Sequence, residues 1–221
     1  MDFEEIIKFF NENHDENNLK TMKRLKAGSS KTYGIKMPVL RKLAKDIGTD
    51  HKLSIQLWNH GYHDSRILAT LIEDPNEVTE NQLDLWVHDF DNWDIVDQAC
   101  INILYYMPSA IDKIPIWAKS EEKNSIQSNC SYCSSWQEIR KNDYFEKFFP
   151  LIINGSNDNR NFVKKAVNWA LRSIGKKNKF LNKRALEVSN EILAIDCKSC
   201  KWITKNAIKE LESEKVQKKI K

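Results

Sequence analysis

The feature that most constrains this chain is a tryptophan that recurs along a helical pattern. Trp58, Trp86 and Trp117 each close one amphipathic segment, and a short polar turn then leads to another. These tryptophans are spaced by 28 and 31 residues. A helical hairpin that repeats near this period buries its apolar face only by stacking on its neighbour. The pattern therefore predicts an all-α chain, folded as a curved α-solenoid with one helix of each pair on its concave face.

Proline and glycine agree with this interpretation. The five prolines fall mostly at the starts of apolar-periodic segments, where the first helical turn tolerates them. Glycines such as Gly48, Gly61 and Gly175 fall near segment ends, where helices stop. No pair of alternating segments joined by a hairpin turn is evident, so no β-sheet is expected.

The sequence also argues against membrane insertion and secretion. No apolar run approaches the roughly 18 residues that a membrane-spanning helix requires. The first five residues include three acidic ones, where a signal peptide is basic. The five cysteines fit a reducing compartment, in which structural disulfides are rare.

Two CxxC pairs, Cys130/Cys133 and Cys197/Cys200, bear on metal binding. Together they could suggest a four-thiolate zinc site. However, Cys133 and Cys197 stand 64 positions apart, too far for a compact zinc ribbon. The Cys197 pair also sits inside a helical pattern, where thiols pack as small apolar groups. We therefore expect buried thiols, with no metal and no organic cofactor.

The net charge of +4 conceals an asymmetry between the two halves. Residues 1–110 carry 12 Lys and Arg against 18 Asp and Glu, or −6, whereas residues 111–221 carry 23 against 13, or +10. Nine basic residues and no acidic one fall within 159–186. Because Phe162 and Trp169 interrupt this block, it belongs to folded structure rather than to a solvated tail. A basic stripe on a folded element indicates a polyanionic partner.

The segment Arg160–Lys177 shows how this stripe is organised. Its predicted buried face consists of five apolar residues at helical spacing: Val163, Ala166, Val167, Ala170 and Ile174. Trp169 lies off that face and shares another with three cations, Lys165, Arg172 and Lys176. Either Trp169 packs against the next repeat among solvated cations, or it presents an aromatic face to nucleic-acid bases or sugars.

A second candidate position lies in the helix that opens with Trp93. Trp93 and Asp97 are four residues apart and therefore adjacent on one helix face. Asp94, in the first turn, is explained by capping and the helix dipole. From Ile95 to Met107, Asp97 is the only charged residue. A poorly solvated carboxylate is costly unless it is paired, so Asp97 either accepts a buried hydrogen bond from a neighbouring helix terminus or serves a function.

Longer segments around these residues resemble a known family. DFDNWDIVDQAC (89–100) and NRNFVKKAVNWALRSIGKKN (159–178) are similar to the two motifs of the DNA alkylation repair family, AlkD-like glycosylases built from HEAT-like repeats. YGIKMPVLRKLAKDIG (33–48), WNHGYHDSRILATLIEDP (58–75) and CKWITKNAIKEL (200–211) also resemble it. The resemblance covers nearly the whole chain, and it implies one domain over residues 1–221, an α-α superhelix of HEAT-like helical repeats.

The resemblance implies excision of positively charged N-alkylated purines, such as 3-methyladenine and 7-methylguanine, from double-stranded DNA in base excision repair. Family members hold the lesion without extruding it into a deep pocket, unlike most enzymes that act on bases. Carried over by position, Trp93 and Trp169 would face the lesion nucleotide and Asp97 would be the catalytic carboxylate. Arg172 would be the cation that flanks the site.

The chemistry of these residues agrees with that activity. An N-alkylated purine is already a cationic leaving group, so the enzyme need not protonate it. A fixed carboxylate in a low-dielectric cleft can stabilise the developing oxocarbenium ion of the sugar or orient the attacking water. Indole faces attract cations by about 0.5–2 kcal/mol, which favours charged lesions over neutral bases.

The expected partner is double-stranded DNA that contains alkylated bases, and the expected form is a monomer in the cytoplasm, associated with the nucleoid, or in the nucleus of a eukaryote. Phosphate contacts are expected from the basic stripe, which Lys36 and Arg41 would extend. The residues expected to bind DNA are Arg172, Lys164, Lys165, Lys176, Lys36 and Arg41.

One segment departs from the family pattern and favours the first of two alternatives. After Trp117, family members usually continue into an apolar helix with an arginine that faces the DNA. This chain reads EEKNSIQSNCSYCSSW (121–136), with Gln127 or Ser128 at the position of that arginine. The first alternative is a relative that recognises DNA by shape without excision. The second is a protein-interaction scaffold, against which the basic stripe argues.

Overall fold

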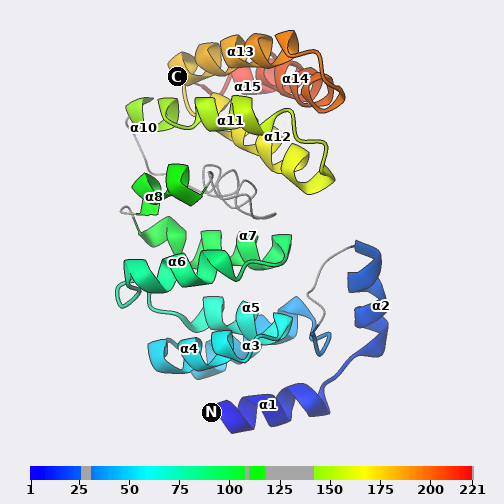
Figure 1. The fold of residues 1–221 in the computed structure, drawn as a ribbon, viewed down its shortest axis with the longest axis vertical. Helices are drawn as coiled ribbons and strands as arrows, with labels where there is room; N and C mark the ends of the chain where they lie inside the picture. Colours follow the sequence, from blue (N-terminus) through cyan, green and yellow to red (C-terminus); the bar gives the residue numbers. More distant parts are fainter. Residues whose placement is uncertain (26–30, 108–109, 118–141, 221) are drawn as a thin grey trace. The chain divides into compact units, whose positions relative to one another are not determined.

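The computed structural model describes residues 1–25, 31–107, 110–117 and 142–220, and all regular structure in these ranges is helical (Figure 1). The prediction of an all-α chain is confirmed. The chain divides into two compact units, the first Met1–Ile111 and the second Asp112–Lys221. This division falls where the charge changes sign, so the first unit is acidic and the second basic. Within the described residues, no helix is long and apolar enough to cross a membrane.

The first unit begins with α1 (Phe3–Glu12) and α2 (Glu16–Leu25) and then runs through successive antiparallel helices. These are α3 (Met37–Ile47), α4 (His51–Asn59), α5 (His63–Ile72), α6 (Glu80–His88), α7 (Trp93–Asn102) and the short 3-10 turn η1 (Leu104–Tyr106). The point of division lies within α8 (Ala110–Trp117).

Helix starts in this unit follow from side chains that satisfy free backbone N–H groups. Asp2 and Glu5 form a reciprocal capping box at α1. Asp50 accepts from the backbone N–H of Leu53 at the start of α4. These caps set the helix boundaries on which the stacking of the pairs depends.

Helix α5 lies at the centre of the first unit, because it packs against α3, α4 and α7. Its apolar residues, such as Leu68, are buried, and so are the polar residues of its first turn, His63 and Asp64. Polar groups at such a position must find partners inside the protein. Their partners come from the neighbouring hairpins.

Two of the recurring tryptophans stack directly on one another. The rings of Trp58 and Trp86 are almost parallel, with centroids 3.9 Å apart. The indole N–H of Trp58 donates to Oδ2 of Asp89 at 3.0 Å. The interval predicted from the tryptophans is therefore the interval at which successive hairpins pack.

Hydrogen bonds between hairpins recur at an interval of 31 residues. Asp64 accepts from the backbone N–H of Tyr33, 31 residues earlier, at 2.6 Å. Asp94 bonds His63, also 31 residues earlier, at 2.7 Å. The bond from Trp58 to Asp89 has the same separation. The carboxylates thus join each hairpin to the preceding one.

The second unit contains a short pair of helices and then three long helices that pack on each other. Their bounds are α10 (Asn142–Glu146), α11 (Phe149–Gly155), α12 (Asn161–Gly175), α13 (Lys179–Ala194), α14 (Lys198–Leu211) and α15 (Glu214–Gln217).

Helices α12, α13 and α14 approach closely at the end of α12. A Cβ atom at Gly175 would lie only 2.7 Å from the side chain of Leu211 on α14 and 3.0 Å from Cβ of Ala185 on α13. The buried amide of Asn182 donates to the carbonyl of Gly175 at 3.0 Å, so this helix end keeps its hydrogen bonds. Close packing here fixes α12 against α14.

The prediction of buried thiols is wrong for one CxxC pair. Cys197 and Cys200 form a disulfide. Cys197 lies at the N-cap of α14 rather than inside the helix, and its Cα is 5.0 Å from that of Cys200, within bridging range. Cys100 is buried and keeps its thiol, as expected. Cys130 and Cys133 lie outside the described residues.

We predict that replacing Asp64 with Ala destabilises the protein strongly. Asp64 is completely buried and accepts from Thr32 Oγ1 and from the backbone N–H groups of Tyr33 and Ile35 at 2.6–2.7 Å. Alanine would leave these buried donors without an acceptor, at a cost of about 3 kcal/mol. Urea denaturation measures the change in the free energy of unfolding. Asp46→Ala, which removes an exposed carboxylate from α3, is the matched control.

Candidate functional site

The first turn of α7 carries the candidate residues of the first unit, and the preceding turn holds it in place. The Arg66 guanidinium donates to the carbonyl of Asp89 at 2.9 Å and forms an ion pair with its carboxylate at 3.2 Å. The same guanidinium lies 5.3 Å from the centroid of the Trp58 ring. The turn between α6 and α7 is therefore fixed from α5 and α4, and the start of α7 follows from it.

Beside this turn, the first unit contains a cavity of about 500 Å³. Helix α7 contributes both candidate residues, Trp93 and Asp97, to its wall. The rest of the wall comes from α2, from α3 and the two residues before it, from α5 and from two further residues of α7. It is largely apolar and is formed by Asn18, Met22, Ile35, Lys36, Met37, Pro38, Leu40, His63, Ile67, Asp94 and Gln98. An apolar cavity with a few convergent polar groups is the usual form of a small-molecule site.

The structure brings together three of the predicted site residues in this cavity. Trp93 and Asp97 are both half-buried and line it from adjacent turns of α7. Lys36, at the N-cap of α3, lines it as well and forms an ion pair with Asp15 at 2.9 Å. Arg41 is exposed farther along α3.

The negative charge of Asp97 affects the pKa of a buried thiol in the core, that of Cys100. Burial raises the pKa of the Cys100 thiol well above its ordinary value, and the neighbouring negative charge of Asp97 raises it further. Cys100 is therefore an uncharged thiol at neutral pH.

Two wall residues, His63 and Asp94, form a pair that we did not predict. Nε2 of His63 lies 2.7 Å from Oδ2 of Asp94, and the imidazole is almost fully buried. Nδ1 of the same ring is buried and has no hydrogen-bond partner among the described residues. Burial alone would lower the pKa of His63. The hydrogen bond to Asp94 and the charges of Asp94, Asp64 and Asp91 outweigh it, so the pKa is raised.

The explanation of Asp94 by capping alone is therefore incomplete. Asn92 is the N-cap of α7, and its side chain makes no capping hydrogen bond. Asp94 instead joins α7 to α5 through His63. The sequence signal that was available is the separation of 31 residues between His63 and Asp94, which equals the spacing of Trp86 and Trp117.

In the second unit, α12 has the predicted division into a buried and an exposed face. All five apolar residues predicted to form the buried face are buried. Trp169 is 38% exposed, and Lys165 beside it is exposed. Trp169 is therefore available on the open face of this helix.

Two of the predicted DNA-binding cations share one acidic partner. Both Arg172 and Lys176 form ion pairs with Glu210 on α14, and the Nζ of Lys176 lies 2.8 Å from Oε1. Burial alone would raise the pKa of Glu210, but hydrogen bonds from Lys176 and Arg172 lower it below its ordinary value. Glu210 is thus an anion that holds both cations at neutral pH. Sequence reasoning missed it, because it lies 34 residues or more beyond them.

The remaining predicted cation of α12, Lys164, lies over an aromatic ring. Its Nζ is 4.7 Å from the centroid of the Trp202 ring on α14. This is a cation–π contact, which holds the amine near the helix surface while the ring is still 37% exposed. Gln127 and Ser128, which stand where family members have an arginine, lie outside the described residues.

The paired helices place this chain in the class of helical-repeat proteins, and comparisons with known proteins agree with this assignment. One similar solved structure, at 19% identity and a TM-score of 0.74, covers 86% of this chain and 83% of that chain. It is described as a new family of proteins related to the HEAT-like repeat DNA glycosylases, with affinity for branched DNA structures. The fold is therefore that of HEAT-like repeats.

A family model described as DNA alkylation repair enzyme matches residues 6–211. The chain belongs to the DNA alkylation repair enzyme family. No curated protein is detectably similar in sequence.

We predict that Asp94→Asn lowers the pKa of His63. The mutation removes the hydrogen-bonded carboxylate that opposes burial, so the pKa should fall from its raised value towards or below 6.5. NMR titration of the imidazole measures it, with Asp143→Asn, an exposed carboxylate of the second unit, as the control.

The linked effect on stability has a defined sign. Because the pKa of folded His63 is raised, the pair stabilises the fold fully below about pH 6.5, and this contribution is lost as pH rises through the raised pKa. Asp94→Asn should abolish this pH dependence. An unchanged His63 pKa in that variant would contradict the assignment.

Proposed function

We propose that this protein is a monofunctional DNA glycosylase that excises positively charged N-alkylated purines from double-stranded DNA. The observation that supports this most is the pair of Trp93 and Asp97, which line one cavity from adjacent turns of α7. The membership of the DNA alkylation repair enzyme family supports it independently.

In this proposal Asp97 is the catalytic carboxylate. Cleavage of the N-glycosidic bond leaves positive charge on the deoxyribose, and a fixed carboxylate stabilises that charge most where water is sparse. Asp97 is half-buried at a largely apolar wall. A carboxylate at this position therefore stands in a poorly solvated place.

Trp93 supplies the preference for charged bases. An indole face attracts a cation by about 0.5–2 kcal/mol. An alkylated purine is cationic and an undamaged purine is not, so the same ring stabilises the lesion more than a normal base. Trp93 lies one turn before Asp97 on the same face, which allows both side chains to act on one nucleotide.

The second unit supplies contacts to the DNA backbone through α12. Lys165, Arg172 and Lys176 lie with Trp169 on the face that is not buried in the core. Cations of this kind contact phosphates and position the duplex without reading its sequence. Glu210 orients Arg172 and Lys176 before DNA arrives.

We predict that Asp97→Asn lowers the rate of base release by about two to three orders of magnitude, because the amide cannot stabilise the developing positive charge. The measurement is release of 7-methylguanine from duplex DNA under single-turnover conditions. Asp46→Asn, which also removes one negative charge from the first unit, should release the base at the wild-type rate. Equal rates for wild type and Asp97→Asn would contradict the proposed mechanism.

We predict that Glu210→Gln tightens binding to duplex DNA by roughly three- to tenfold at low salt, because it removes an anion that competes with phosphates for Arg172 and Lys176. Fluorescence anisotropy with a labelled duplex measures the dissociation constant. Glu214→Gln is the matched control, since it removes a Glu–Lys pair of the same unit with the same change in net charge. An equal effect of the two substitutions would show that only net charge matters.

A second candidate is a protein that binds branched DNA without excising a base. The sequence favours it at one point, because Gln127 or Ser128 replaces the arginine that family members carry. The similar structure belongs to proteins with affinity for branched DNA. Tight, salt-sensitive binding to branched DNA together with no base release would support this candidate, and an abasic product would exclude it.

A further inference from the structure

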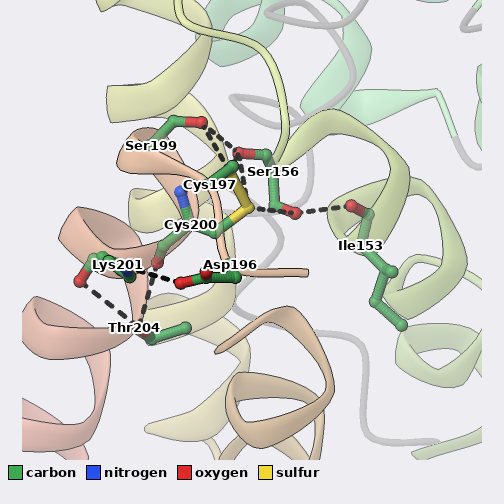
Figure 2. The surroundings of a disulfide bond; sticks show 8 residues. All are labelled: Ile153, Ser156, Asp196, Cys197, Ser199, Cys200, Lys201 and Thr204. Carbon is green, nitrogen blue, oxygen red and sulfur yellow. Dashed lines mark hydrogen bonds and ion pairs between the residues drawn. A yellow bond between two sulfur atoms is a disulfide. The ribbon is translucent and has the colours of Figure 1, made fainter. Parts of the chain in front are cut away.

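The disulfide of the second unit stands at the start of α14 and faces the end of α11 (Figure 2). Cys197 is the N-cap of α14, and its sulfur accepts from the backbone N–H of Cys200 at 2.9 Å. Cys197 is half-buried, whereas Cys200 is completely buried. A dissolved reagent can therefore reach Cys197 and not Cys200.

The position of this bond is unsuited to a structural role. A disulfide between residues three apart closes a very small loop, so it removes little conformational freedom from the unfolded chain. Both cysteines also belong to the same helix end, and the bond joins no two separate elements. Another role is needed to explain why two cysteines stand here.

The surroundings favour a thiolate at Cys197 once the bond is open. The free N–H groups and the positive end of the helix dipole stabilise a negative sulfur at a helix N-terminus, as in other CxxC sites. Lys198 stands exposed between the two cysteines and adds positive charge. Lys201 contributes less, because it is paired with Asp196 at 2.5 Å.

The surroundings also suit the reduced form of Cys200. The carbonyl oxygen of Ser156 accepts from Ser199 Oγ at 2.7 Å and lies 3.5 Å from Sγ of Cys200 and 3.7 Å from Sγ of Cys197 (Figure 2). A disulfide has no S–H to donate to this oxygen. The reduced thiol of Cys200 would find an acceptor already in place, so neither redox state leaves a buried polar group without a partner.

We propose that Cys197 and Cys200 form a reversible redox site that exchanges with low-molecular-weight thiols such as glutathione. A glutathione thiolate attacks Sγ of Cys197, the S–S bond breaks, and its electron pair and a proton go to Sγ of Cys200. A second glutathione thiolate then attacks the glutathione sulfur of the mixed disulfide and releases the thiolate of Cys197. In sum, two molecules of glutathione are oxidised to one glutathione disulfide, and the protein disulfide is reduced to two thiols.

The test is a redox titration of the folded wild-type protein in mixtures of reduced and oxidised glutathione. After acid quenching, alkylation and denaturation, trypsin cleaves at Lys198, between the two cysteines. The oxidised pair then appears by mass spectrometry as fragment 185–198 joined to fragment 199–201. Cys100 and the Cys130/Cys133 pair fall in two other fragments, 67–113 and 124–140. We expect the fraction of joined fragments to depend on the ratio of reduced to oxidised glutathione. The same curve should result whether the titration starts from the oxidised or from the reduced protein.

Two variants identify the attacked sulfur. With oxidised glutathione, Cys200→Ser should gain one glutathionyl group at Cys197, at least roughly tenfold faster than Cys197→Ser gains one at Cys200. Circular dichroism checks that both variants are folded. If either variant is unfolded, the titration of the wild-type protein alone tests the proposal.

Three results would overturn the proposal. The first is a joined pair that opens only when the protein unfolds, which would make the disulfide structural. The second is a pair that stays reduced in oxidised glutathione. The third, in folded variants, is equal reaction at Cys197 and Cys200. None of these results bears on base excision, which the assay with Asp97→Asn tests separately.

Discussion

Three aspartate carboxylates link each helical hairpin to the preceding one in the first unit. Asp64, Asp89 and Asp94 each accept a hydrogen bond from a residue 31 positions earlier. Apolar faces alone would allow neighbouring hairpins to slide, because hydrophobic burial has no direction. Asp64 is completely buried, and a buried carboxylate without partners costs several times more than a hydrogen bond contributes, on the order of several kcal/mol. These three residues are satisfied together only when the hairpins stack in one register, and they therefore select it.

The candidate site depends on that register. Asp89 fixes the turn before α7 through Arg66, and Asp94 fixes the first turn of α7 through His63. Trp93 precedes Asp94, and Asp97 follows one turn later, so these contacts hold both residues in place. A catalytic carboxylate acts well only if its position is maintained without the substrate. The same bonds that stack the repeats thus provide the rigidity that the proposed reaction requires.

Much of the fold could be predicted because it rests on periodic apolar residues. The spacing of Trp58 and Trp86 indicated the repeat, and helical periodicity left Trp169 on the exposed face of α12. Two features could not be predicted. One is an ion-pair partner that lies far away in the sequence, and the other is the position of a cysteine relative to the start of its helix. Glu210 has no periodic signal that links it to its cations on α12. Cys197 would pack as a thiol one turn inside a helix, but it forms a disulfide at the N-cap, and periodicity does not separate these two positions.

The separation of charge between the units answers two conflicting demands of the proposed function. Affinity for DNA requires cations, since neutralised phosphates release their counterions. A carboxylate that stabilises an oxocarbenium ion must not be neutralised by such cations. The first unit, at −6, holds Asp97, and its cavity cation Lys36 is already paired with Asp15. The second unit, at +10, holds the basic face of α12. Glu210 balances these demands within the second unit, because it orders Arg172 and Lys176 in the absence of DNA but competes with phosphates for them when DNA binds.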